Sequence, residues 1–166
     1  MPISSPGRAS RPADRTRGVT LIEMMIVVAI IGLMAGVFFP SVSAGLDSLR
    51  LKSASDSIAG FLNGALNRAE RRQQVIEIAV SLKDNAISLY STEPGFQRRL
   101  SMPEGVRIEA VLPALDGGED PRRFILQPGG TPPRAGIQIA NRRGRRRIVR
   151  VDPMTGVPRI EIPETP

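Results

Sequence analysis

One acidic residue stands alone in the longest apolar stretch of this 166-residue chain. Residues 19–39 contain a single charged side chain, Glu23. At ~1.5 Å of rise per residue, a helix over this stretch would be about 30 Å long, which matches the hydrocarbon core of a bilayer. A carboxylate buried there costs on the order of 2.5–3.5 kcal/mol. The position of Glu23 therefore predicts that it pairs with a positively charged partner.

A second group of chemically active side chains is basic and lies near the C-terminus. Guanidinium groups clustered on a turn can hold phosphates or carboxylates through paired hydrogen bonds. Nucleic acid is one candidate partner, but one Tyr, five Phe and no Trp leave few side chains to stack on bases. A solvated hairpin or a contact with an acidic protein is the preferred interpretation. The arginines that surround Gly144 are Arg142, Arg143, Arg145, Arg146 and Arg147.

Residues suited to catalysis or metal binding are sparse. The chain has no His and no Cys, which removes the commonest general base and the usual zinc ligands. It also has no phosphate-binding loop and no nucleophile motif. Asp116, Glu119 and Asp120 lie in a Gly-rich loop and could bind Ca²⁺, although an ordinary solvated loop is preferred. The sequence predicts a protein that is not an enzyme and needs no cofactor or metal.

The charges are unevenly distributed around these features. Residues 1–18 carry four arginines and one aspartate, and residues 121–166 carry ten arginines and three acids, whereas acids are in excess over residues 19–120. A basic segment before an apolar span predicts that the N-terminus lies in the cytoplasm.

The residues alone leave several interpretations of the N-terminal segment open. A secretory signal peptide could be cleaved after Val42-Ser43-Ala44, but its apolar region is usually shorter, about 7–15 residues, and here it contains Glu23. A simple membrane anchor over residues 19–39 fits the length but assigns no role to the acid.

Beyond residue 39, periodicity predicts the elements that follow. Pro40 should kink rather than end the helix. Apolar or small residues then recur every three or four positions, at Leu51, Ala54, Ile58, Phe61, Ala65 and Ala69. From residue 73 the pattern changes to short β-branched runs separated by turns, with strands predicted over 75–82, 86–91, 106–112, 124–126, 137–139, 148–151 and 157–162. This order predicts an α+β fold, with an antiparallel sheet on the C-terminal half of a helix over about 19–72.

The segment Arg17-Gly18-Val19-Thr20-Leu21-Ile22-Glu23 resembles the leader junction of type IV pilins and type II secretion pseudopilins. The resemblance implies that a prepilin peptidase cuts between Gly18 and Val19 and that the new amine of Val19 is methylated. It also implies that Glu23 pairs with the amine of a neighbouring subunit and sets the axial register, and that Pro40 is the family's kinking proline. Val19 departs from the Phe or Met usual at that position.

Three later segments are similar to the minor pseudopilin H/FimT group: residues 61–75, 124–130 and 152–158. The resemblance implies a pilin fold with a removed leader (1–18), a transmembrane segment (19–39), an amphipathic continuation (40–72) and a periplasmic β-rich domain (73–166). It implies a single-pass protein of the bacterial inner membrane whose partners are other pseudopilins, the prepilin peptidase, the secretion platform and the lipid bilayer. The expected function is that of a minor pseudopilin of type II secretion. The alternative is a minor type IV pilin in pilus assembly or DNA uptake, with DNA as partner.

Overall fold

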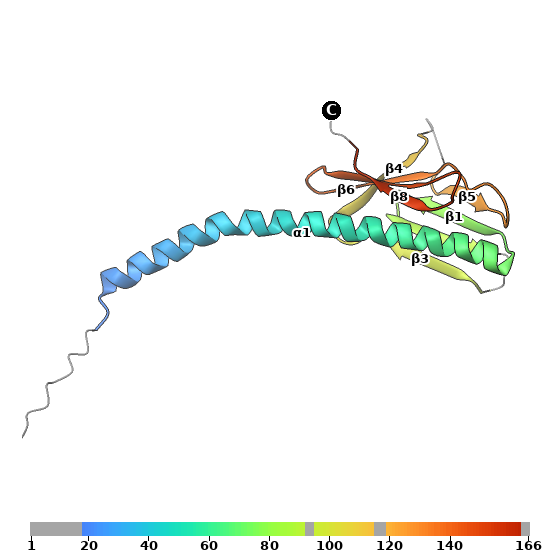
Figure 1. Cartoon of the computed structure of the whole chain (residues 1–166). Coiled ribbons are helices and arrows are strands. Elements are labelled where there is room, and N and C mark those ends of the chain that lie inside the picture. Colours follow the sequence, from blue (N-terminus) through green and yellow to red (C-terminus); the bar gives the residue numbers. More distant parts are fainter. Residues whose placement is uncertain (1–17, 92–94, 115–118, 164–166) are drawn as a thin grey trace, which may run out of the picture. The chain divides into compact units, whose positions relative to one another are not determined.

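The computed structural model of this chain describes residues 18–91, 95–114 and 119–163. The chain divides into two compact units, residues 1–40 and residues 41–166. Within the described ranges the elements are one helix and eight strands (Figure 1). The predicted leader residues 1–17, the loop residue Asp116 and the side chains of residues 37 and 39–41 lie outside the described part.

The helix α1 (Leu21–Arg72) has 52 residues. The hydroxyl of Thr20 accepts a hydrogen bond from the N–H of Glu23 at 3.3 Å, so Thr20 caps the N-terminus. At the C-terminus Gln73 has a φ of 50°, and the N–H of Gln74 donates to the carbonyl of Ala69 at 3.2 Å, which is the Schellman arrangement. The predicted helix is confirmed, and it begins at residue 21 rather than 19 because of the cap.

Pro40 lies inside α1, and the helix continues past it. Its side chain is outside the described part, so the predicted kink stays a prediction.

The C-terminal part of α1 buries one stripe of side chains in the unit of residues 41–166. Phe61, which periodicity places on this stripe, is only partly buried, and its neighbour Leu62 takes the buried position. The members of the stripe, each at most 4% exposed, are Leu51, Ala54, Ile58, Leu62, Ala65 and Ala69.

The strands form two antiparallel sheets of four strands each. The first sheet has the order β3-β2-β1-β5 and the second has the order β4-β6-β7-β8. The strands of the first sheet are β1 (Ile76–Ser81), β2 (Ala86–Ser91), β3 (Gln97–Ser101) and β5 (Arg122–Leu126). The strands of the second are β4 (Val106–Leu112), β6 (Gly136–Asn141), β7 (Arg146–Val151) and β8 (Pro158–Glu161).

The α+β architecture is therefore confirmed, whereas the prediction of a single sheet is wrong. β5 does not extend the sheet of its predecessor β4 but pairs with the free edge of β1. Both sheets and α1 contribute to one apolar core, which includes Ile58 from α1, Ile87 from β2 and Ile139 from β6, all fully buried.

Sequence reasoning missed β3. Four of its five residues are exposed and only Leu100 packs against the core, so the strand shows no apolar alternation. It forms because β2 offers an unpaired edge, with Ile87 opposite Leu100. Two arginines on such an edge strand discourage further strand pairing.

Candidate functional site

The predicted leader junction precedes the first turn of α1. Residues 18–20 are exposed and are neither helix nor strand. A Cβ added to Gly18 would meet no atom within 4 Å. Gly18 and Val19 are therefore both solvent-exposed, and a side chain at position 18 would not disturb the part of the chain that the structure describes.

Glu23 is exposed in the first turn of α1. Its carboxylate makes no hydrogen bond or ion pair with any residue that the structure describes. A carboxylate at this end of a helix is favoured by the helix dipole, and the spacing Thr20-x-x-Glu23 is that of a capping box. That spacing is visible in the sequence, so the cap could have been predicted from it.

The large apolar side chains between the junction and Pro40 are exposed within the first unit, with Leu21 at 79% and Leu33 at 73%. Among the described residues, no helix has both the length and the apolar character needed to cross a membrane. The span over 19–39 stays a prediction.

The arginine cluster lies on the turn between β6 and β7, and Asn141 shapes this turn. The Oδ1 atom of Asn141 accepts hydrogen bonds from the backbone N–H groups of Arg143 and Arg145, both at 3.0 Å. Gly144 has a φ of +76°, a conformation that suits glycine. Sequence reasoning identified the turn but not the role of Asn141, whose type and position before a turn are a recognisable signal.

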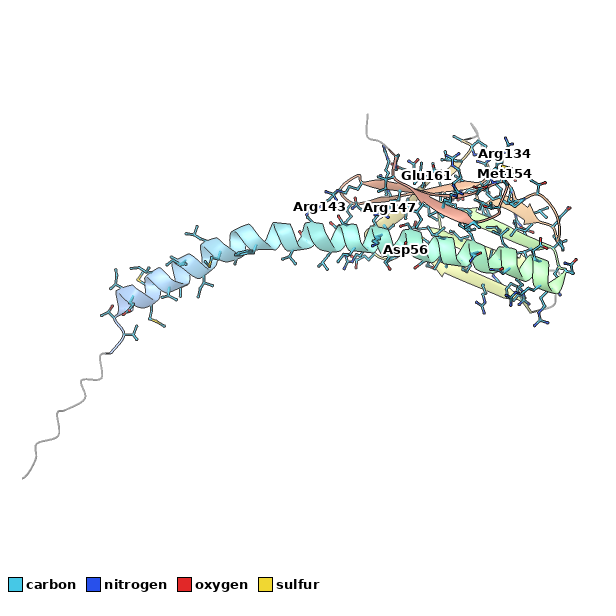
Figure 2. The ribbon with its side chains drawn as sticks, in the orientation of Figure 1. Asp56, Arg134, Arg143, Arg147, Met154 and Glu161 are labelled. Atoms are coloured by element: carbon cyan, nitrogen blue, oxygen red, sulfur yellow. The ribbon has the colours of Figure 1, made fainter. Side chains whose placement is uncertain are left out.

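Two of the five arginines hold the turn against α1. Arg143 is labelled in Figure 2. Its Nε atom lies 3.3 Å from Oδ2 of Asp47, and its Nη2 atom donates to the hydroxyl of Ser43 at 3.1 Å. The Nη1 atom of Arg145 donates to the hydroxyl of Ser48 at 3.1 Å. We call these three contacts the helix clamp, and they connect the β6–β7 turn to the helix segment that follows Pro40.

Two further arginines pair with carboxylates of the second sheet and its turns. Arg142 contacts Glu104 at 2.5 Å. Arg146 makes a two-point contact with Glu109 through Nε at 2.6 Å and Nη2 at 3.0 Å. This hydrogen bonding to Arg146, together with a hydrogen bond from Gln138, lowers the pKa of Glu109 below its usual value.

The cluster is therefore much less cationic than its sequence suggests. Arg142, Arg143 and Arg146 each have a carboxylate partner. Arg147, labelled in Figure 2, is half-buried, and its side chain forms no hydrogen bond or ion pair within the described ranges. The structure brings the five predicted residues to one turn but uses most of them for contacts inside the chain.

Asp120, from the loop considered as a Ca²⁺ site, instead binds the backbone of the β1–β2 turn. Its Oδ1 atom accepts the N–H of Leu82 at 2.8 Å, and its Oδ2 atom accepts the N–H of Lys83 at 3.1 Å. These bonds hold the β1–β2 turn. The described residues contain no group of acids arranged for a metal ion, and Asp116 lies outside them.

Comparison with known proteins gives matches to the N-terminal segment and to most of the chain. A family profile described as "Prokaryotic N-terminal methylation motif" matches residues 14–39. Type II secretion system core protein G of Klebsiella pneumoniae is 32% identical over 131 residues, which are 72% of this chain and 89% of that protein. The chain belongs to the type II secretion pseudopilin family.

A second relative of this pseudopilin is type II secretion system protein H of Xanthomonas campestris pv. campestris, 36% identical over 63 residues. That match covers 37% of each chain. No solved structure matches this pseudopilin significantly.

One contact joins two of the segments that resemble the H/FimT group. Glu70, in the last turns of α1, accepts the N–H of Gly129 at 2.9 Å. Gly129 has a φ of +66° and belongs to the turn Pro128-Gly129-Gly130 after β5. The end of the helix and this turn, far apart in sequence, therefore stabilise each other in the pseudopilin.

The third such segment is a turn organised by Asp152. Its Oδ1 atom accepts the N–H groups of Met154 at 2.9 Å and Thr155 at 3.1 Å. The backbone hydrogen bond from Met154 is the main reason that the pKa of Asp152 lies below its usual value. The turn joins β7 to the edge strand β8 of the pseudopilin.

Proposed function

We propose that this pseudopilin is a minor, H-type subunit that acts mechanically and not as an enzyme. A prepilin peptidase removes residues 1–18 and methylates the amine of Val19. The segment 19–39 anchors the protein in the inner membrane, with the domain of residues 73–166 in the periplasm. The subunit then leaves the bilayer and joins a short filament that helps proteins cross the outer membrane.

The observation that carries this proposal is an acid, Glu23, that has no partner among the described residues and lies five positions after the predicted cut. In an apolar environment a lone carboxylate is costly, whereas a carboxylate paired with an amine is tolerated. The amine of Val19 in a neighbouring subunit supplies that pair once the leader has been removed. Glu23 thereby favours one axial register during assembly.

Leader processing is the most direct test. The full chain is co-expressed with a prepilin peptidase and its mature form is examined by N-terminal sequencing and intact mass. We expect a protein that begins at Val19 and carries one extra methyl group. We expect Gly18→Ala to remain full-length with unchanged thermal unfolding, because the added Cβ meets none of the described atoms within 4 Å.

Gly45→Ala is the matched control. Gly45 lies in α1, and its added Cβ also meets no atom within 4 Å, so this variant should be processed normally. A Gly18→Ala protein that is trimmed like the control would refute the leader assignment. A mature protein that starts anywhere other than Val19 would instead indicate a periplasmic anchor protein unrelated to filaments.

A second candidate function is that of a minor type IV pilin in pilus assembly or DNA uptake. The observation that favours it is the concentration of five arginines at one turn. Salt-dependent binding of duplex DNA by the full chain, lost on joint replacement Arg145→Ala with Arg147→Ala, would support this function over secretion. The pairing of three of the arginines with carboxylates argues for the pseudopilin.

A further inference from the structure

A hollow of about 380 Å³ lies where the turn before β4 meets the turn between β6 and β7. We call it the turn hollow. It is separate from the helix clamp, which uses the other side chains of the β6–β7 turn. The residues that line the turn hollow are Gly105, Val106, Arg107, Asn141, Arg142 and Gly144.

The shape of the turn hollow depends on a glycine. Gly105 has a φ of +85°, and a Cβ added there would lie 3.3 Å from Nε of Arg142. The side chain of Arg142 therefore rests directly on the backbone of the neighbouring turn. This packing holds one guanidinium group at the rim.

A second guanidinium group of the turn hollow has only a weak partner. Arg107 is 72% exposed in its side chain and reaches Glu109 at 3.8 Å. The oxygens of Glu109 already accept hydrogen bonds from Arg146 and from Gln138. Arg107 therefore keeps its hydrogen-bonding capacity for a further acceptor.

A buried amide also lines the turn hollow. Asn141 is 4% exposed, and its Nδ2 atom has no acceptor among the residues that the structure describes. Its Oδ1 atom is occupied by two backbone N–H groups, which fixes the orientation of the amide. Buried donors are normally satisfied, so the turn hollow combines two cations and one unsatisfied donor.

One carboxylate of the chain already approaches this site from outside. Glu104 contacts Arg142 at 2.5 Å, but the two side chains are 79% and 60% exposed. An ion pair this exposed stabilises a protein very little. An incoming carboxylate can therefore replace Glu104 on Arg142 at small cost.

We propose that the turn hollow binds an acidic side chain of a neighbouring subunit, with Arg107 and Arg142 as donors and the buried Asn141 in the wall of the site. This inference rests on the proposed function, in which the globular domain contacts other subunits. A single carboxylate fits better than nucleic acid, because Glu104 and Glu109 beside the hollow repel a polyanionic backbone. The site thus gives the arginine-rich turn a protein partner.

The test uses the full chain in detergent micelles and, as the probe, a short peptide with blocked ends that carries a single glutamate among uncharged residues. Binding is followed by fluorescence anisotropy of the labelled peptide and by the NMR signal of the Asn141 side-chain amide. We expect Arg107→Gln and Arg142→Gln each to weaken binding about ten-fold, as for loss of a charged hydrogen bond. The amide signal should shift when peptide binds to the wild type.

Arg99→Gln is the matched control, because Arg99 lies on β3 of the other sheet and is half exposed. Thermal unfolding of each variant verifies that it is folded. Equal affinities in the control and the two turn variants would overturn the proposal, and so would an Asn141 amide signal that peptide does not move. Tighter binding of duplex DNA than of the peptide would also overturn it. None of these results affects leader processing at Gly18, so failure here is distinguishable from failure of the proposed function.

Discussion

The helix clamp makes a quantitative prediction about the junction between α1 and the second sheet. The perturbation is a double-mutant cycle with Arg143→Ala, Asp47→Ala and the combined variant. The two side chains are 45% and 16% exposed, and Nε of Arg143 lies 3.3 Å from Oδ2 of Asp47. The pair is therefore half-buried rather than fully solvated.

The expected coupling follows from this geometry. Fully exposed ion pairs contribute about 0.2–1 kcal/mol, whereas hydrogen bonds to charged groups contribute about 1.5–3 kcal/mol. The clamp lies between these cases, so we expect a coupling free energy of about 1 kcal/mol. For a unit the size of residues 41–166, a destabilisation of that magnitude lowers Tm by about 4 °C.

The assay combines thermal unfolding of the full chain in detergent with hydrogen exchange of the helix segment 43–51. Loss of the clamp should increase exchange in that segment more than in the core strand β6. The pair Arg99–Asp84 serves as control, since its atoms are 3.6 Å apart and the side chains are 51% and 62% exposed. A coupling no larger than that of the control, or unchanged exchange over 43–51, would refute the reasoning.

Two further predictions concern carboxylates of the same unit. Asp120→Ala should lower the free energy of unfolding by about 1–2 kcal/mol in urea titrations, because two backbone N–H groups lose their acceptor. If adding Ca²⁺ raised the Tm of the wild type but not that of this variant, the result would contradict the role of Asp120 in holding the turn. Glu109 has a lowered folded-state pKa owing to Arg146, so its contribution to stability is present above the ordinary Glu pKa of about 4.3 and is lost as pH falls through the lower folded value. A pH series of Tm for the wild type and Glu109→Gln measures this, and parallel curves in the acid range would argue against it.

The part of the fold set by local periodicity was predictable from the sequence. The buried stripe of α1 follows the spacing of three and four residues, and the β1–β2 hairpin follows its β-branched runs and the turn at Asn85, which has a φ of 50°. Each of these elements is defined by residues close together in the chain. The same local reasoning made one small error, because it placed Phe61 on the buried stripe where the structure buries Leu62.

The pairing between distant strands was not predictable in this way. The strand β3 has almost no apolar pattern and exists because β2 has a free edge, and β5 returns to β1 across the intervening β4. Such choices depend on which edges remain open after the rest of the chain has packed. The arginine cluster pairs with Asp47, Glu104 and Glu109, which lie 37 or more residues away in the sequence. These pairs likewise could not be predicted from local sequence patterns.

The sequence by itself identified the predicted leader junction, the lone acid Glu23 and the α+β order of elements, because each depends on residue types at short spacing. Only the tertiary structure decided what the arginine-rich turn does. The sequence shows how many charges the turn carries but not their partners. Folding brings carboxylates from α1, from the second sheet and from the turn before it to three of the five arginines. Ionic interactions depend on distance in space and on burial, so charges that look available along the chain become internal contacts of the pseudopilin.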